Sequence, residues 1–251
     1  MPEIRVEDLS HTFGKGTPAA LTVLEGINLT FESGSFNAIV GTSGCGKSTL
    51  LKMMAGLFEP SDGQMTLDGE VIKGTDQRRG MVFQQDAVFP WMTVARNISY
   101  GPRLRGASKA QQREIEEKWV KMVGLAGFED RWPRELSGGM RKRVDIGRVY
   151  ANDPDILLMD EPFGALDAQT KERMQDDLLD TWSQSRKTVV FVTHDLEEAI
   201  FLADKIIVMS ARPGRIHHIE DVSLVRPRTP DMRLTDEFIQ VKRKLWGMLD
   251  H

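Results

Sequence analysis

A glycine-rich run near the N-terminus has the residue types and spacing of a phosphate-binding loop. It reads Gly41-Thr42-Ser43-Gly44-Cys45-Gly46-Lys47-Ser48-Thr49, a glycine and four variable residues followed by Gly-Lys-Ser. Backbone N–H groups in such a P-loop converge on phosphate oxygens, and the start of the following helix adds partial positive charge. Lys47 is placed to reach the β- and γ-phosphates, and the Ser48 hydroxyl to bind Mg²⁺. We therefore predict a nucleoside triphosphate as the ligand.

A pair of carboxylates forms the second group of side chains that could do chemistry. The apolar residues 156–159 predict a buried strand, and Asp160 and Glu161 follow at its end. In a P-loop protein the first acid, Asp160, holds Mg²⁺ directly or through water. Glu161 is placed to polarise an attacking water as a general base. The alternative, a solvated strand end, is disfavoured because the same chain carries the P-loop.

The segment Leu136-Ser137-Gly138-Gly139-Met140 indicates a second phosphate site. A Ser-Gly-Gly turn that opens a helix presents its backbone N–H groups to an anion. Alone, such a turn is more often a helix cap, but here it precedes the strand that ends in Asp160 and Glu161. A P-loop and a separate phosphate-binding turn in one chain suggest that two chains enclose two nucleotides.

The segments around these groups predict an α/β fold, because strands and helices alternate along the chain. Residues 36–40 indicate a buried strand before the P-loop, and residues 50–55 a helix after it. From residue 151 the alternation resumes, which predicts a mostly parallel sheet covered by helices on both faces. The predicted elements are strand 156–159, helix 168–185, strand 188–192, helix 196–203 and strand 206–209.

These patterns divide a single domain, residues 1–251, into zones. Ser108 is the predicted N-cap of a helix that ends near Val123, and residues 228–251 predict a short terminal helix. Apolar residues near the N-terminus alternate with polar ones, as in half-buried strands. The zones are an N-terminal β zone (1–34), an α/β core (35–85 and 151–215), a helical zone (86–150) and a C-terminal tail (216–251).

Composition limits the classes of protein to which the chain can belong. Its 251 residues are 40% hydrophobic and 28% charged, which is ordinary for a globular protein. The net charge of −4 argues against a nucleic-acid partner. The sequence has no apolar run long enough for a membrane span, no secretory segment and only one cysteine, Cys45, so no internal disulfide forms. We expect a cytosolic protein, whose membrane role would require a partner that carries the spans.

Taken together, the motifs resemble those of the ATPase subunit of an ATP-binding cassette (ABC) transporter, over residues 4 to about 215. The Leu136–Met140 segment matches the family signature, and Gln84 matches the Q-loop glutamine. Ala165-Leu166-Asp167 matches the D-loop, and His194 the switch histidine. The resemblance implies a P-loop NTPase core with an antiparallel β subdomain and an inserted α-helical subdomain.

The same resemblance implies a head-to-tail dimer and a role for each site residue. The P-loop of one copy and the Ser137 turn of a second copy would enclose each ATP, and Phe13 would lie against adenine. The implied catalytic residues are Glu161, His194 and Gln84. The implied Mg²⁺ ligands are Ser48, Gln84 and Asp160. The implied ATP-binding residues are Phe13, residues 41–49, Ser137, Gly138, Gly139 and Asp167.

Some of these residues have simpler alternatives. Phe13 could pack in the core beneath the strand pair, although phenylalanine keeps the ring face that stacking on adenine uses. Gln84 could be a surface amide, and His194 could be a structural hydrogen-bonder.

Three residues after the signature depart from the commonest family pattern. Lys142 stands where glutamine is usual, and Asp145 and Gly147 where small apolar residues are usual. The spacing places Asp145 within pairing reach of Arg141 and Arg148. We interpret the departures as variation on the helix surface.

Phe89-Pro90-Trp91 follows the Q-loop, and Met140 closes the signature. Together with residues 160–167 and 209–216, these features resemble the nitrate, sulfonate and taurine branch of bacterial importers. The branch implies permease subunits, a periplasmic or lipoprotein solute-binding protein, a small anion as transported substrate, and a place at the cytoplasmic face of the bacterial inner membrane. An exporter or a lipid-trafficking system is the alternative. We expect the zone around Phe89, Pro90 and Trp91 to dock a cytoplasmic helix of the permease, unless Trp91 and Tyr100 are core.

Overall fold

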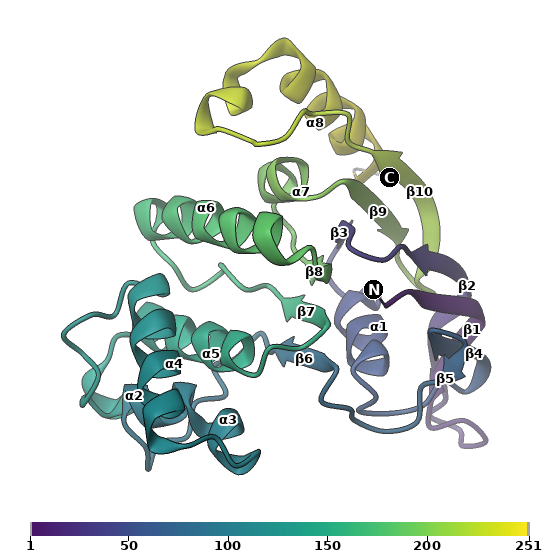
Figure 1. Cartoon of the computed structure of the whole chain (residues 1–251). Coiled ribbons are helices and arrows are strands. Elements are labelled where there is room, and N and C mark those ends of the chain that lie inside the picture. The colour runs from purple at the N-terminus through teal and green to yellow at the C-terminus, as the bar shows by residue number, and fades with distance from the viewer. Residues whose placement is uncertain (1, 250–251) are drawn as a thin grey trace. The chain divides into compact units, whose positions relative to one another are not determined.

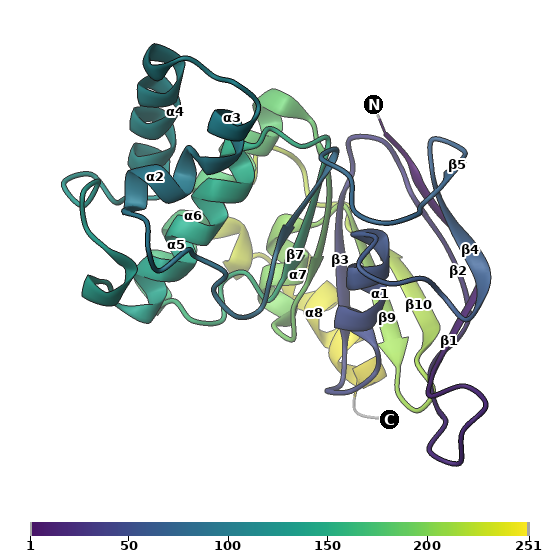
Figure 2. The ribbon, with the colours of Figure 1, turned by 90° about the horizontal axis from the view of Figure 1, so that it is seen from below.

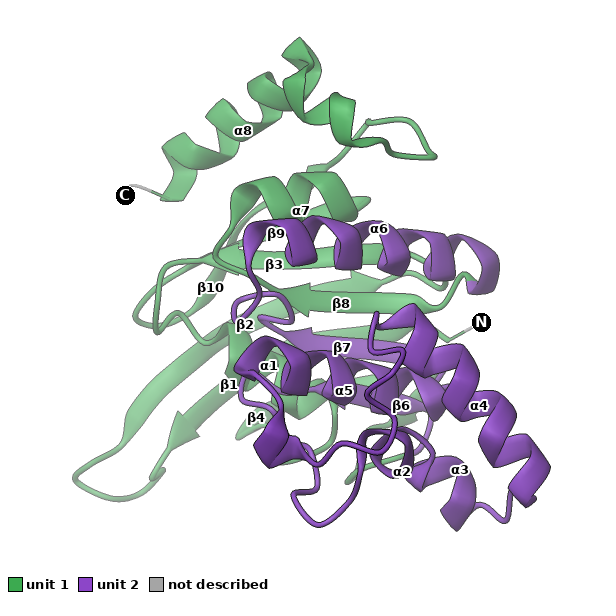
Figure 3. Cartoon of the chain, turned by 90° about the vertical axis from the view of Figure 1, so that its left-hand side faces the viewer, with its two compact units in different colours: residues 1–76, 186–251 green, residues 77–185 purple. Residues whose placement is uncertain are grey.

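The chain folds into two compact units in the computed structural model, which describes residues 2–249. Unit 1 comprises the described parts of residues 1–76 and 186–251, and unit 2 comprises residues 77–185 (Figure 3). The predicted P-loop and switch histidine fall in unit 1, whereas the paired carboxylates, the Q-loop glutamine and the signature turn fall in unit 2.

Unit 1 contains an antiparallel sheet whose strands lie in the order β2-β1-β4-β5. Buried apolar residues of β1 and β2, such as Ile4, Val6, Ile27 and Leu29, alternate with exposed polar residues, which confirms the predicted half-buried strands. The last two strands come from beyond residue 34, so the sheet extends past the predicted N-terminal zone. The strands are β1 (Ile4–Phe13), β2 (Leu21–Phe31), β4 (Asp62–Leu67) and β5 (Glu70–Val71).

The second sheet of unit 1 carries the P-loop at the end of its central strand. Strand β3 (Phe36–Gly41) pairs in parallel with β8 (Thr188–Val192) and β9 (Lys205–Ser210). Helix α1 (Lys47–Met54) lies on one side of β3, and α7 (Leu196–Leu202) on the other (Figures 1 and 2). Every residue of β3 and β8 is buried, as expected of parallel strands that helices cover on both faces.

A strand at the edge of the second sheet was not predicted, and neither were β4 and β5 of the first sheet. Strand β10 (Arg215–Asp221) pairs antiparallel with β9 at the edge of the sheet. None of its residues is fully buried. An edge strand of this kind needs no run of apolar residues, and its sequence has none of the kind that predicts the central strands. The first part of the predicted C-terminal tail is therefore an edge strand.

The C-terminal tail is fixed to the end of α7 by a buried arginine. Arg228 donates hydrogen bonds to the backbone carbonyls of Ile200 (2.9 Å) and Phe201 (3.0 Å). Burial lowers the pKa of its guanidinium to about 10. Beyond it, α8 (Asp236–Leu249) buries Phe238 and Leu245, which confirms a terminal helix within residues 228–251; residues 250–251 lie outside the described chain.

Unit 2 combines two parallel strands with five α-helices. Strands β6 and β7 pair in parallel, with Val82 opposite Met159. Ser108 caps α4 and Gln111 completes a capping box, which confirms the predicted helix start. Among residues 2–249, no helix has both the length and the apolarity that crossing a membrane requires. The elements are β6 (Arg79–Val82), α2 (Val94–Ile98), α3 (Tyr100–Leu104), α4 (Lys109–Met122), α5 (Gly138–Ala151), β7 (Ile156–Asp160) and α6 (Ala168–Ser185).

Candidate functional site

The P-loop leaves β3 at Gly41 and enters α1 through two residues that only glycine fits well. Gly44 and Gly46 have φ angles of 81° and 93°, in the left-handed region that glycine adopts at low cost. A Cβ atom on Gly46 would also lie 2.5 Å from a side-chain carbon of Leu24. The N-cap residue of α1, Gly46, makes no side-chain cap hydrogen bond, so the helix start suits a phosphate, as the sequence motif predicts.

The turn at Gly214, which is distant in sequence, packs against the P-loop. Gly214, between β9 and β10, donates its N–H to the carbonyl of Val23 and accepts from the N–H of Glu25. A Cβ atom at Gly214 would lie 2.1 Å from the carbonyl oxygen of Cys45. The turn therefore packs directly against the backbone of the P-loop, and Cys45 is a buried space-filling residue.

Lys47 is folded back onto its own loop. Its Nζ donates hydrogen bonds to the carbonyls of Gly41 (2.8 Å) and Thr42 (3.0 Å), and the residue is only 8% exposed. Its Nζ lies 3.8 Å from the sulfur of Cys45, a weak acceptor. Ser48 follows on the first turn of α1 and is half-buried. The amine is thus held at the loop, with its strongest protein contacts made to two backbone carbonyls.

Two other predicted site residues lie in unit 1. His194 is exposed two residues after β8, and β8 is the parallel neighbour of β3, so His194 and the P-loop lie at the same ends of adjacent strands. Phe13 is 47% exposed and packs edge-on against His11, with ring centres 4.6 Å apart. The core-packing alternative for Phe13 is therefore wrong, and part of the ring is available for stacking.

In unit 2, Gln84 and Glu161 meet because of the pairing of their strands. Val82 lies opposite Met159, and each functional side chain comes two residues later. The Gln84 side-chain amide donates to Glu161 Oε2 at 3.3 Å. Asp160, the last residue of β7, is buried. Glu161 itself has a φ angle of 46°, which is costly for a residue with a side chain and is common at functional sites.

The signature turn begins α5 next to the D-loop. The Ser137 hydroxyl accepts a hydrogen bond from the N–H of Met140 at 3.2 Å and caps the helix. A Cβ atom on Gly139 would lie 3.3 Å from a side-chain carbon of Leu166, so glycine permits close packing there. Asp167 accepts from the N–H of Thr170, and this hydrogen bond lowers the pKa of its carboxyl group. Gly138 is exposed beside them.

The interpretation of Lys142, Asp145 and Gly147 as helix-surface variation is wrong, because α5 turns all three inward. Lys142 is 1% exposed and Asp145 is fully buried. Burial lowers the pKa of the Lys142 amine and raises the pKa of the Asp145 carboxyl. Of its two expected partners, Asp145 binds Arg148 (2.7 Å), whereas Arg141 pairs with Asp86 instead. A Cβ atom on Gly147 would lie 3.2 Å from Val123, so the small residue permits close helix packing.

The aromatic residues after the Q-loop differ in exposure. Trp91 is 65% exposed, so it is not a core residue of the helical zone. Phe89 lies between Trp91 and Tyr100, at ring-centre distances of 5.5 and 4.6 Å. Tyr100 is half-buried. An exposed tryptophan on such an aromatic base is typical of a surface that binds another protein.

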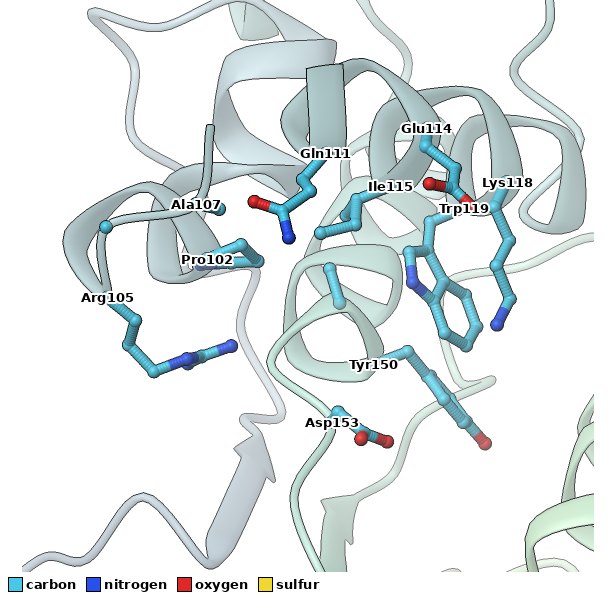
Figure 4. Close-up of a pocket in the computed structure, with 12 residues that line it drawn as sticks. Pro102, Arg105, Ala107, Gln111, Glu114, Ile115, Lys118, Trp119, Tyr150 and Asp153 are labelled. Atoms are coloured by element: carbon cyan, nitrogen blue, oxygen red, sulfur yellow. The ribbon is translucent and has the colours of Figure 1, made fainter. Parts of the chain in front are cut away.

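A cavity of about 600 Å³ lies elsewhere in unit 2, between α4 and the end of α5 (Figure 4). Trp119 and Tyr150 form part of its wall, with ring centres 5.2 Å apart. Its charged lining residues are of both signs: Arg105, Glu114, Lys118 and Asp153. None of the predicted site residues lines it, so this cavity is separate from the motif residues.

Comparison with known proteins gives the same assignment as the motifs. The sequence matches the family described as ABC transporter over residues 24–164. It is 46% identical over 247 residues to an uncharacterized ABC transporter ATP-binding protein of Methanocaldococcus jannaschii, covering 98% of this chain and 91% of that one. It is 43% identical over 248 residues to an aliphatic sulfonates import ATP-binding protein of Bacillus cereus, covering 99% and 96%.

A solved structure shows the same architecture. It is the dimeric structure of an ATP-binding cassette in a post-hydrolysis state, bound to ADP and Pi, and it superposes with a TM-score of 0.80 at 32% identity. The match covers 88% of this chain and all of that one. The fold, the family match and the relatives agree, and the chain therefore belongs to the ABC transporter family, as an ATP-binding subunit that hydrolyses ATP.

Proposed function

We propose that this ATPase powers a bacterial importer of a small anion, such as nitrate, a sulfonate or taurine, and that Glu161 is its general base. The observation that carries the catalytic assignment is the hydrogen bond between Gln84 and Glu161 at the paired ends of β6 and β7. Glu161 directly follows the buried Asp160, which is the order that a metal ligand and a base require in a P-loop enzyme.

In this proposal the site residues divide the tasks of hydrolysis. The P-loop amides and Lys47 bind and orient the phosphates, and Phe13 stacks on the adenine. Glu161 accepts the proton of the attacking water, while the Gln84 amide holds the carboxylate in place. His194 contacts the γ-phosphate, and Asp167 of the D-loop also contacts the nucleotide.

The proposed Mg²⁺ ligands fit the chemistry of that ion. Ser48, Gln84 and Asp160 offer a hydroxyl, an amide and a carboxylate oxygen, and Mg²⁺ prefers such oxygen ligands together with substrate phosphates. When bound, the ion would offset negative charge on the phosphates.

The proposed working form is a head-to-tail dimer with two composite sites. The Ser137 turn is a capped helix start in which Gly138 is exposed and Gly139 half-buried, and it is suited to the phosphates of a nucleotide held by a second copy. The dimeric cassette structure supports this proposal, because it is similar to this chain along most of its length.

Permease subunits and a solute-binding protein are the proposed transport partners, with the ATPase at the cytoplasmic face of the inner membrane. The similarity to an aliphatic sulfonates import protein favours import. The alternative is the ATPase of an exporter or lipid-trafficking system. ATP-driven uptake of a sulfonate into vesicles that carry the permease from the same gene cluster would support import, and outward movement would refute it.

Replacing Glu161 with glutamine tests the catalytic assignment. Glu161→Gln keeps the side-chain size but removes the base, so we expect turnover to fall by about 10²–10⁴-fold while ATP binding is retained. Light scattering should then detect an ATP-dependent dimer. Glu172→Gln, an exposed acid on α6, is the control and should hydrolyse ATP normally. Near-normal turnover of Glu161→Gln would refute the assignment.

A further inference from the structure

Lys142 lies beneath the Q-loop and not on the surface of α5. Its amine donates hydrogen bonds to the backbone carbonyls of Phe83 and Gln84, the latter at 3.2 Å. Both carbonyls come directly after β6, so the amine fixes the backbone where the chain leaves that strand. A buried charged group is costly unless it is hydrogen-bonded, and here the two carbonyls satisfy it.

Two more contacts attach the same segment to α5. Arg141 forms an ion pair with Asp86 at 2.5 Å. The guanidinium of Arg148 lies over the ring of Phe89, 4.8 Å from its centre, and the buried Asp145 holds that guanidinium. Residues 83–89 are therefore fastened to one helix at three points.

The fastened segment carries the glutamine that contacts the proposed base. The Lys142 amine binds the main chain of Gln84, and the Gln84 side chain binds Glu161. These contacts form a continuous path from α5 to Glu161. The other end of the path is functional as well, because Ser137, which caps α5, opens the proposed phosphate-binding turn.

We propose that Lys142 is a positioning residue for ATP hydrolysis, which sets the place of the Gln84 main chain and thereby of the Gln84 amide at Glu161. The inference rests on the proposed roles of Gln84 and Glu161. Under this inference α5, which begins at the proposed phosphate-binding turn, also supports the proposed base Glu161 through Gln84. A shift of α5 would therefore move the Q-loop with it.

A double-mutant cycle tests the inference, with Lys142→Met, Gln84→Ala and the combination. Lys142→Met keeps most of the side-chain volume but removes the donor. We expect kcat to fall about tenfold or more, because a misplacement of about 1 Å can cost about a hundredfold. The KM for ATP should change less than about twofold, since the P-loop keeps its contacts. In the Gln84→Ala background the same substitution should change kcat less than about twofold, because the group it positions is absent.

Arg143→Met is the matched control. Arg143 is the next residue of α5 and also donates to two backbone carbonyls, those of Val123 (3.1 Å) and Gly124 (2.9 Å), away from the Q-loop. Its loss should lower the unfolding temperature while kcat stays within about twofold of wild type. An equal loss of kcat in Arg143→Met and Lys142→Met would overturn the inference, because it would indicate only a general need for an intact helix.

Glutamine at the same position provides a second variant. Lys142→Gln keeps an amide donor, so its kcat should exceed that of Lys142→Met by at least about threefold, which corresponds to a weak hydrogen bond. It also replaces the methionine variant in the cycle if that variant does not fold. Equal kcat values for folded Lys142→Gln and Lys142→Met would overturn the inference.

Gln84→Ala alone separates this inference from the proposed function. Normal hydrolysis by Gln84→Ala would refute the proposed role of Gln84 and remove the basis of the inference. If Gln84→Ala loses activity and the Lys142 effect multiplies with it unchanged, only the inference fails.

Discussion

Replacement of Lys47 by methionine should weaken ATP binding by an amount that follows from the contacts of its amine. A lysine amine has three donors, and in this structure two of them bind the carbonyls of Gly41 and Thr42. The third points toward the weak acceptor Cys45 and can turn to a phosphate without breaking the loop. We therefore assign the amine one net charge-assisted hydrogen bond to ATP, of about 1.5–3 kcal/mol.

That free energy corresponds to an affinity about 10- to 150-fold weaker for Lys47→Met, since about 1.4 kcal/mol is a factor of ten. The assay is equilibrium binding of labelled ATP at fixed ionic strength, with circular dichroism to check folding. Lys52→Met, on the same helix, is the control and should bind ATP as wild type does. An affinity for Lys47→Met within about twofold of wild type would refute the assignment, because the loop would then bind phosphate without its lysine.

Three further predictions concern the dimer, the partner surface and the tail. A mixture of Ser137→Arg and Lys47→Met chains should leave one composite site free of both substitutions and recover part of the ATPase activity that each lacks alone; no recovery would contradict composite sites. Trp91→Ala, folded by circular dichroism, should keep basal ATPase activity but lose assembly with the permease, because the exposed ring packs on Phe89 and not in the core; normal assembly and transport would exclude it from the docking surface. Arg228→Met should lower the free energy of unfolding by about 1–3 kcal/mol, because two carbonyls of α7 lose their donor; an unchanged denaturation midpoint would show that water replaces it.

The central elements could be predicted from the sequence because burial leaves a clear pattern. The strand at 188–192 and the helix at 168–185 have the predicted bounds, since one is an apolar run and the other has helical periodicity. Helix α1 begins at Lys47, before the predicted residue 50, because the end of the P-loop is already helical. Strand β10 was missed because an edge strand needs no apolar run.

The motif residues of the candidate site could be selected from the sequence, but not their contacts. The bond between Gln84 and Glu161 depends on the register of β6 against β7, which no local pattern specifies. Lys142 was misassigned because a lysine in a helix rich in charged residues resembles a solvated one. Its partners are main-chain carbonyls, and every residue type carries a carbonyl, so the sequence gives no sign of them.

Nucleotide binding depends on Gly214 as well as on the P-loop motif, so the positions that tolerate no change extend well beyond that motif. A methyl group there would collide with the carbonyl of Cys45, although more than 160 residues separate the two in sequence. Gly247, on α8, has no atom near its Cβ position and should accept alanine. In a library of single substitutions scored for ATP binding, position 214 should therefore be as intolerant as the P-loop glycines, whereas position 247 should vary freely.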